Sequence, residues 1–187
     1  IIIGGGPAGL NAAMILGRSR RKILLFDSGE PRNRWSSSMN GFLSSDGVNP
    51  ADFIQKGREE LKKYNIEIID HPVTDATYSK GIYVIEANEG HIYHSRKLLL
   101  ATGLKDTLPD VEGIAELYGQ SVHHCPYCDG WESRDKAIAV YGKDRSGIGQ
   151  ALAMKNWSED VTLYTDGTRK LNNKDMELLD LNGVKVC

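Results

Sequence analysis

Gly4-Gly5-Gly6-Pro7-Ala8-Gly9 is the stretch that decides the fold, because it joins an apolar run to a segment rich in Ala, Met and Leu. The run before it, Ile1 to Ile3, is β-branched and predicts a strand, whereas residues 10–16 predict a helix. A second apolar run, Ile23 to Phe26, predicts another strand and ends at Asp27. A strand, a tight turn, a helix and a second strand form one crossover unit, which requires a parallel sheet.

The spacing of Gly4, Gly6 and Gly9, followed by an acid after the next strand, is typical of a dinucleotide-binding loop. One glycine makes the tight turn, one lets backbone N–H groups approach a pyrophosphate, and one lets helix and strand pack closely. The helix N-terminus supplies positive potential to phosphates, and a carboxylate can accept both ribose hydroxyl protons. A glycine-rich turn without a ligand is the alternative. We predict that the cofactor is bound by Gly4, Gly5, Gly6, Pro7, Ala8, Gly9 and Asp27.

Between residues 28 and 108 the sequence predicts a polar connection, a second helix and a small antiparallel sheet. The segment 28–49 is rich in Ser, Gly, Asn and Arg, and we expect it to run over a ligand or a domain edge. The other expected elements are a helix at 50–64, a strand at 66–69, a β-meander at 73–78, 81–87 and 91–93 with turns at 79–81 and 88–90, and a buried strand at 98–100.

The buried strand 98–100 is closed by Ala101-Thr102-Gly103. This segment resembles the one that flavoproteins with two dinucleotide folds place beside their FAD, so Ala101, Thr102 and Gly103 are further candidates for cofactor contacts. Arg32, Asn33 and the backbone near Val73 are weaker candidates, since each can instead belong to a solvated loop.

A second crossover unit follows a linker. Residues 108–120 hold one proline and two glycines without a clean period, as a linker does, and then strands at 137–141 and 161–164 flank a helix at 148–157. The same unit therefore occurs twice. We predict an α/β protein with two Rossmann-like nucleotide-binding domains, the first carrying the β-meander. The predicted domains are an FAD-binding domain at 1–108 and an NAD(P)-type domain with the cysteine pair at 109–187.

The second glycine loop departs from the pattern of the first. Gly142 and Gly147 occupy the first and third glycine positions, and both are candidates for nucleotide contacts, but Asp144 stands at the middle position. A carboxylate there would crowd and repel a pyrophosphate. Asp166 follows the next strand at nearly the distance at which Asp27 follows Gly4, and an acid there suits ribose hydroxyls better than a 2'-phosphate. Arg169 and Lys170 come next and offer compensating charge.

Cys125 and Cys128 are separated by two residues, and the other cysteine of the chain is Cys187. A close pair in a cysteine-poor chain indicates redox or metal chemistry in a reducing compartment, so we predict a cytoplasmic location. At a helix start the pair has a lowered thiolate pKa, and Asp129 can shuttle the proton that disulfide exchange requires. Zinc is the alternative, because His123 and His124 adjoin the pair, but no second knuckle exists, so we predict no metal. A histidine can also serve as a second base or as a polar surface residue.

Cys125-Pro126-Tyr127-Cys128-Asp129-Gly130 resembles the active site of low-molecular-weight thioredoxin reductases, and the order of the three motifs matches that family along almost the whole chain. The resemblance implies FAD as cofactor, Cys128 facing the flavin, Cys125 attacking a substrate disulfide, and Asp129 as the acid–base residue. It also implies a homodimer, a domain rotation, and a thioredoxin-like protein or a small dithiol or disulfide as substrate.

The electron donor is open at this stage. Asp144 and Asp166 lead to the hypothesis that pyridine nucleotide, whether NADPH or NADH, binds weakly or not at all. The family resemblance then allows two directions: reduction of a disulfide, or oxidation of a dithiol with transfer of electrons to oxygen, as in related dithiol oxidases. A non-enzymatic flavin redox sensor is the alternative from another class, although a sensor has no need of Asp129.

Composition excludes several classes of function. Hydrophobic residues make up 40% of the 187 residues and charged residues 26%, as in an ordinary soluble domain. The formal net charge of −2 offers no basic field, so we expect neither nucleic acid nor an anionic membrane as a partner. The apolar runs are too short to span a bilayer. The chain starts inside a strand-like run and ends in another, so we expect it to be an excerpt of a longer polypeptide.

Overall fold

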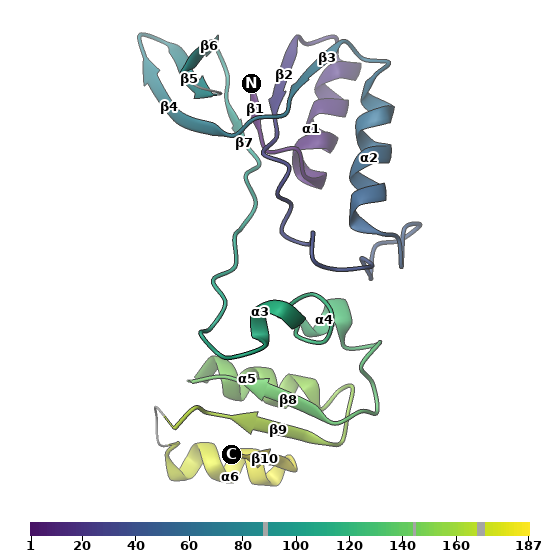
Figure 1. Ribbon diagram of the computed structural model, residues 1–187, viewed down its shortest axis with the longest axis vertical. Coiled ribbons are helices and arrows are strands. Elements are labelled where there is room, and N and C mark those ends of the chain that lie inside the picture. Colours follow the sequence, from purple (N-terminus) through teal and green to yellow (C-terminus); the bar gives the residue numbers. More distant parts are fainter. Residues whose placement is uncertain (88–89, 144, 168–170) are drawn as a thin grey trace. The chain divides into compact units, whose positions relative to one another are not determined.

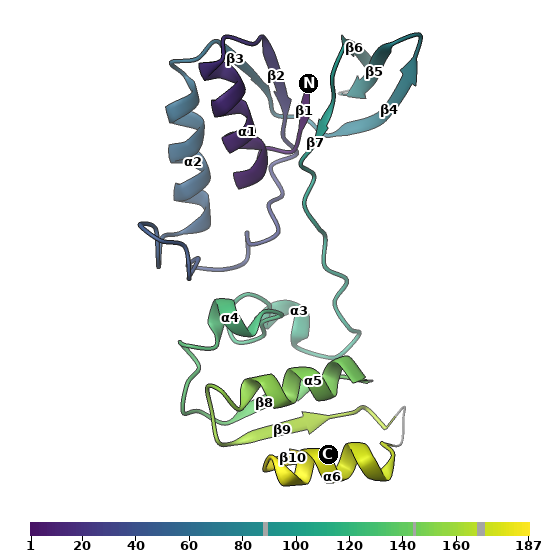
Figure 2. The same cartoon turned by 180° about the vertical axis from the view of Figure 1, so that it is seen from behind.

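The computed structural model describes residues 1–87, 90–143, 145–167 and 171–187 (Figure 1). It divides into two compact units, 1–122 and 123–187. Each unit has its own parallel sheet with helices against it, as both views of the chain show (Figures 1 and 2). The predicted α/β class with parallel sheets is confirmed.

In the first unit a four-stranded parallel sheet has the order β3-β2-β1-β7. Helices α1 and α2 lie side by side against one face of this sheet (Figure 1). A three-stranded antiparallel sheet, β4-β5-β6, is the predicted meander. The elements are β1 (Ile2–Ile3), α1 (Pro7–Arg18), β2 (Ile23–Phe26), α2 (Pro50–Leu61), β3 (Ile66–Ile69), β4 (Val73–Ser79), β5 (Ile82–Ala87), β6 (His91–Ser95), β7 (Leu99–Leu100) and the short helix α3 (Ile114–Leu117).

The alternation of side chains along β2 explains how the parallel sheet is covered on both faces. Ile23 and Leu25 join the core that contains Leu10 and Leu61 of the two helices. The buried ring of Phe26 lies in another core, with Ile85 and Ala87 of the meander. Successive side chains of a strand point to opposite faces, so one short apolar strand serves both cores.

The second unit repeats the plan with a three-stranded parallel sheet of order β10-β9-β8. Its core combines strand residues such as Val161 and Leu163 with Ile148 and Ala151 of one helix and Leu179 of another. The elements are α4 (Pro126–Asp129), β8 (Ile138–Tyr141), α5 (Arg145–Met154), β9 (Val161–Tyr164), α6 (Asn173–Leu181) and β10 (Val184–Val186).

Contacts group residues 109–122 with the first unit, whereas the sequence assigned this linker to the second domain. The Tyr118 hydroxyl donates to Asp106 Oδ2 at 2.8 Å. A Cβ at Gly119 would lie 2.6 Å from the backbone of Trp35, so this linker lies close against the segment after β2. The assignment of a cofactor to each domain stays a prediction.

Most predicted elements lie where the sequence places them. The differences are at their ends and in the burial of β7, whose Leu99 and Leu100 are exposed in this structure although the strand was predicted to be buried. Helix α2 ends at Leu61 instead of Tyr64, and residues 28–49 contain no helix or strand beyond an isolated bridge between Met39 and Val48. Of the predicted turn at 88–90, only Gly90 lies inside the described residues. Among the described residues, no helix combines the length and the apolar character needed to cross a membrane.

Candidate functional site

The first glycine loop is held tightly against the sheet. The Gly4 N–H donates to Phe26 O at 2.8 Å, and Gly4 has a φ of +110°, which only glycine adopts readily. A Cβ at Gly4 would overlap the carbonyl of Ala101, and a Cβ at Gly9 would overlap the carbonyl oxygen of Gly4. These two glycines are therefore required by the packing of β1, β7 and α1, with or without a ligand.

Gly6 differs from its neighbours because a Cβ there would meet no atom within 4 Å. It is the N-cap of α1, with extended dihedrals of −72° and −177°, and no side chain caps the helix. Pro7 is the first helical residue, and Pro7 and Ala8 are exposed. The N–H groups of a first helical turn have no partner within the helix and attract anions. The open space over Gly6 therefore fits a phosphate group of a dinucleotide.

Asp27 lies beside this loop, directly after β2. Its Oδ1 accepts from the Gly29 N–H at 3.2 Å, and a Cβ at Gly5 would overlap its carboxylate. Arg58 of α2 lies 3.9 Å from Asp27 Oδ2 and also pairs with Asp70. Arg58 could not be singled out from the sequence, because its proximity to Asp27 depends on the packing of α2 beside the loop. A half-buried carboxylate at this place can accept ribose hydroxyls.

The segment after β7 borders the same loop. The Ala101 N–H donates to Ile3 O at 2.8 Å, which continues the pairing of β7 with β1. Thr102 and Gly103 are exposed, and Gly103 has a φ of +67°. The structure therefore brings Ala101 next to Gly4, and both residues are predicted cofactor contacts.

The three weaker cofactor candidates are placed differently. The Arg32 guanidinium makes two hydrogen bonds to Asp106, of 2.7 and 2.6 Å, and this partner raises the pKa of Arg32. Asn33 is exposed, and its backbone carbonyl oxygen accepts from the Ser36 N–H at 3.0 Å. Val73 starts β4 and packs against the core beside the meander. None of these observations assigns the three residues to a ligand, so they stay predictions.

Cys125 and Cys128 are joined by a disulfide at the start of α4. Cys125 is the N-cap of this short helix, Pro126 is its first residue, and the two Cα atoms are 5.3 Å apart. Within the second unit Cys128 is exposed and Cys125 is half-buried. The structure thus places the predicted pair in a disulfide at the start of a short helix.

Asp129 adjoins the disulfide and faces His123. The His123 Nδ1 lies 3.4 Å from Asp129 Oδ1, and both side chains are largely buried, with exposed fractions of 24% and 20%. Burial raises the pKa of Asp129 above its usual value; His123 and His124 oppose this rise, and Glu132 adds to it. A carboxyl that keeps its proton to higher pH is suited to donate that proton near the sulfurs.

Gly130 lets the disulfide helix approach its neighbours. A Cβ at Gly130 would overlap the carbonyl oxygen of Pro126 and lie 2.8 Å from the ring of Trp157. The Tyr127 ring meets the same indole edge to face, with centroids 5.4 Å apart. Gly130 therefore has a packing role. This role could not be predicted from the sequence, because Trp157 is distant along the chain.

The described residues offer the zinc alternative no second set of ligands. No group of three or more His, Cys, Asp or Glu side chains in ranges 1–87, 90–143, 145–167 and 171–187 is arranged to hold a metal ion. His123 instead pairs with Asp129, which gives it a place beside the acid–base candidate.

In the second glycine loop the close glycine pair is present. Gly142 and Gly147 contact each other so closely that a Cβ on either would overlap or crowd the other's backbone. The Gly142 N–H donates to Tyr164 O at 3.0 Å, as Gly4 donates to Phe26 in the first unit. The prediction of weak nucleotide binding by this loop rests partly on Asp144, and the compensating charge on Arg169 and Lys170. These three residues lie outside the described residues.

The strand pairing corrects the equivalence of Asp166 with Asp27. Ile3 pairs with Phe26 in the first unit, and Tyr141 pairs with Tyr164 in the second. The residue that follows Tyr164, and so corresponds to Asp27, is Thr165. The Thr165 N–H donates to the carbonyl oxygen of Cys187, directly after β10, at 3.1 Å, and the Asp27 N–H donates to that of Ile69, the last residue of β3, at 3.0 Å. Asp166 lies one residue further, where its backbone has a φ of +61°.

Asp166 is bound by two side chains of its own unit. Its Oδ2 lies 2.8 Å from Lys143 Nζ and accepts from the Tyr141 hydroxyl at 3.0 Å. The hydrogen bond from Lys143, with a smaller effect of Tyr141, lowers the pKa of Asp166, and the same bond to Asp166 raises the pKa of Lys143. The carboxylate of Asp166 is therefore anionic at neutral pH, and it is held beside Lys143 of the second glycine loop.

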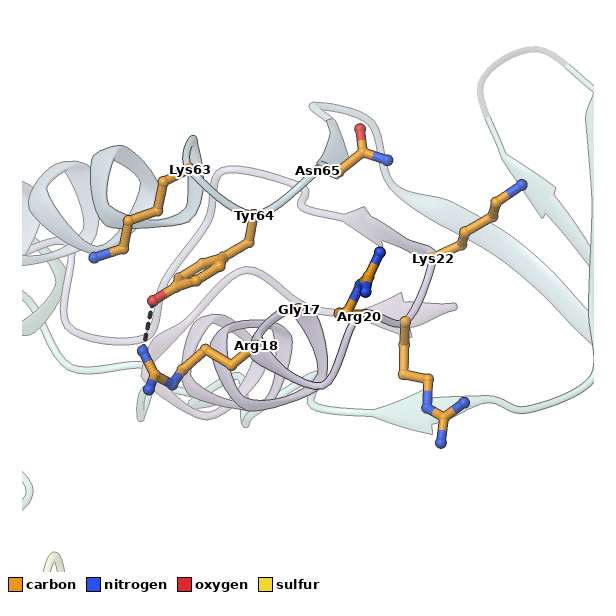
Figure 3. Close-up of a pocket in the computed structure, with 8 residues that line it drawn as sticks. Gly17, Arg18, Arg20, Lys22, Lys63, Tyr64 and Asn65 are labelled. Carbon is orange, nitrogen blue, oxygen red and sulfur yellow. Dashed lines mark hydrogen bonds between the residues drawn. The ribbon is translucent and has the colours of Figure 1, made fainter.

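A basic hollow of about 590 Å³ lies elsewhere in the first unit (Figure 3). Arg18 at the end of α1 donates to the Tyr64 hydroxyl at 3.0 Å, and this bond lowers the pKa of Tyr64. Cations at the carboxyl end of a helix complement its dipole, which explains their presence here. The lining residues are Gly17, Arg18, Arg20, Arg21, Lys22, Lys63, Tyr64 and Asn65.

Comparison with known proteins agrees with this geometry. The profile of the pyridine nucleotide-disulphide oxidoreductase family matches residues 1–181. The chain belongs to this family. A probable thioredoxin reductase of Arthroderma benhamiae is 35% identical over 175 residues, which span 90% of this chain and 43% of that protein. The predicted resemblance to thioredoxin reductases is confirmed.

Solved structures show the same fold over the whole chain. The crystal structure of HlmI has a TM-score of 0.95 at 38% identity, covering 100% of this chain and 59% of that one. An oxidoreductase from Agrobacterium tumefaciens has a TM-score of 0.94 at 40% identity, covering 100% and 63%. This chain thus spans 43% of the length of the Arthroderma benhamiae protein and about 60% of the lengths of these two structures.

Proposed function

We propose that this chain supplies the flavin-binding and disulfide-bearing parts of a thioredoxin reductase-type enzyme. The enzyme passes electrons between FAD and a substrate disulfide through Cys125 and Cys128. The observation that carries this proposal is the disulfide at the start of α4, beside the half-buried Asp129, in a chain whose first loop is open to a dinucleotide at Gly6.

The first unit fits FAD by the chemistry of its donors and acceptors. The first turn of α1 offers N–H groups to the pyrophosphate above Gly6, and Asp27 accepts ribose hydroxyls. Ala101 brings the end of β7 against the same turn. When bound, the flavin supplies two-electron redox chemistry.

Disulfide exchange needs a nucleophile, a leaving group and a proton. In the reduced enzyme the Cys125 thiolate attacks one sulfur of the substrate disulfide, and the other substrate sulfur leaves with a proton. Cys128 then attacks Cys125 in the mixed disulfide, which releases the second substrate thiol and restores the Cys125–Cys128 bond. Two electrons have passed to the substrate. Asp129, whose pKa is raised by burial, supplies a proton to the leaving sulfur.

The opposite direction of electron flow is favoured by the Lys143–Asp166 pair, in which a carboxylate lies beside Lys143 of the second glycine loop. In this alternative the pair of cysteines takes two electrons and two protons from a dithiol, and oxygen accepts them as hydrogen peroxide. The pyridine nucleotide then binds weakly or is not used. Thioredoxin-like proteins and small dithiols or disulfides remain the proposed substrates, in a homodimeric cytoplasmic enzyme.

Steady-state assays of the full-length protein test the proposal and choose the direction. With NADPH or NADH and a thioredoxin, a reductase oxidises the nucleotide; with a dithiol and air alone, an oxidase produces one peroxide for each disulfide. Cys125→Ser and Cys128→Ser should each abolish either turnover and retain the flavin. A redox sensor would show neither turnover, and wild-type protein that contains flavin and lacks both activities would contradict the proposal.

A further inference from the structure

The position after the first glycine differs between the two nucleotide folds. In the first fold it is Gly5, where a Cβ would overlap the Asp27 carboxylate. The carboxylate can therefore lie over the loop only because Gly5 has no side chain. This combination of a bare glycine and a neighbouring acid leaves the ribose position negatively charged.

In the second fold the same two positions carry Lys143 and Thr165, as the matching hydrogen bonds of Gly4 and Gly142 show. A long cationic side chain has replaced the bare glycine, and a neutral hydroxyl has replaced the acid. Lys143 would by itself place an ammonium group near the ribose position, and that charge would attract a 2'-phosphate.

The ammonium of Lys143 is already engaged. Asp166 Oδ2 lies 2.8 Å from Lys143 Nζ, and the Tyr141 hydroxyl donates to the same oxygen at 3.0 Å. The Lys143 Nζ also lies 5.6 Å from the centre of the Tyr141 ring, which adds a cation–π contact. Tyr141, Lys143 and Asp166 thus form one cluster, which we call the Lys143 cluster.

We propose that Asp166 is a specificity-determining residue, which occupies Lys143 in place of a 2'-phosphate and makes the second fold discriminate against 2'-phosphorylated nucleotides. This inference rests on the reductase direction of the proposed function, in which the second fold takes a pyridine nucleotide with an adenosine half. A 2'-phosphate must displace a tethered carboxylate, whose effective concentration is high, and must then lie beside its negative charge. A 2'-hydroxyl carries no charge and avoids both costs.

The charges of the cluster agree with this role. The hydrogen bond from Lys143 lowers the pKa of Asp166, so the carboxylate stays ionised through the physiological range. Its φ of +61° is a conformation that Asn adopts as readily as Asp, which makes Asp166→Asn a substitution of charge with little strain. The same unit offers a matched control, because Asp160 pairs with Lys185 at 2.8 Å on its surface.

The test measures equilibrium binding of two probes that differ only in the 2'-phosphate, adenosine 2',5'-bisphosphate and adenosine 5'-phosphate, to the full-length protein by calorimetry. Asp166→Asn should bind the bisphosphate about tenfold more tightly than wild type, while its affinity for the monophosphate changes by less than about threefold. Asp160→Asn should change neither. Adding Lys143→Met to Asp166→Asn should remove the gain, because the freed ammonium causes it.

Equal gains for both probes, no gain for Asp166→Asn, or a gain that persists without Lys143 would each overturn the inference. Failure of all variants to bind either probe at millimolar concentration would overturn it as well. The protein is titrated with FAD bound, so that the probes cannot occupy the first fold. Since neither probe carries electrons, these outcomes do not depend on the redox chemistry of Cys125 and Cys128, and a failure of the proposed redox function would be seen separately.

Discussion

The loop at Gly4–Gly9 and the loop at 142–147 stand at the same place in two crossover units. Both begin with a glycine whose N–H donates to the end of the neighbouring strand, and the first and third glycines of both are enforced by close contacts. They differ in the side chains that surround the ligand position. The first loop presents Gly6, open space and Asp27, whereas the second presents the Lys143 cluster.

This difference separates two roles that one glycine pattern combines. The first and third glycines specify the packing of a strand on a helix, so their presence indicates the fold. The middle glycine and the acid specify what can be bound. A chain that keeps the first and third glycines but changes the middle glycine and the acid retains a nucleotide fold with altered binding. We interpret the second unit in this way.

The largest effect should follow from a change at a packing glycine. In Gly9→Ala the new methyl group would overlap the Gly4 carbonyl oxygen, so the turn cannot close as it does now. We expect a loss of more than about 3 kcal/mol in the free energy of unfolding and purification without flavin. Urea denaturation and absorbance near 450 nm measure both. Wild-type stability would show that this contact does not hold the turn.

The residue that follows the second strand of each crossover unit, Asp27 or Thr165, should matter unequally for FAD. Asp27→Ala removes the carboxylate that accepts ribose hydroxyls, and we expect FAD affinity to fall about 30-fold. Thr165→Ala is the matched change in the second fold and should alter FAD affinity by less than about twofold. Titration of the apoprotein with FAD, followed by fluorescence, measures both. Similar losses in the two variants would show that the folds have been assigned wrongly.

Gly6→Ala should separate binding from packing inside the first loop. Its dihedrals suit alanine, and the new methyl group would meet no protein atom within 4 Å. The methyl group would instead enter the space meant for the pyrophosphate, so we expect about tenfold weaker FAD binding. The melting temperature of the apoprotein should stay at the wild-type value. A destabilised apoprotein with unchanged FAD affinity would show that Gly6 serves packing and not binding, which would contradict this prediction.

The smallest effect should be that of Asp166→Asn on stability. Both partners of the Lys143–Asp166 pair are exposed, and such pairs stabilise little, so the melting temperature at pH 7 should fall by less than about 2 °C. The pKa of Asp166 is lower in the folded state, so the pair stabilises above the unfolded-state pKa and its contribution disappears as pH falls through the folded-state value. Thermal scans at pH 7 and pH 3 measure this difference, and a larger effect at low pH would contradict it.

The sequence was sufficient for features that depend on neighbours along the chain. The glycine spacing, the apolar strands and the order of elements predicted two nucleotide folds, and the family match confirms that architecture. The closeness of Ala101 to Gly4 was also predictable, because parallel strands end at one edge of a sheet.

Features that depend on long-range contacts were beyond the sequence. Arg32 stays a predicted cofactor contact, but its pairing with Asp106, which is 74 residues away, could not be predicted. Counting from Gly142 equated Asp166 with Asp27, because counting cannot show that Thr165 is the residue that follows the last strand pair. The pairing of His123 with Asp129 depends on the turn of α4, which brings residues on either side of Cys125 together.

The most direct test of the account is an anaerobic titration of the full-length protein with dithiothreitol, followed by the flavin absorption band. The account predicts a yellow protein whose band near 450 nm bleaches in the wild type, because electrons pass from the dithiol through the Cys125–Cys128 pair to the flavin. In Cys128→Ser the band should persist on the same timescale. A colourless wild-type protein, or a flavin that dithiothreitol reduces equally fast without Cys128, would contradict the account.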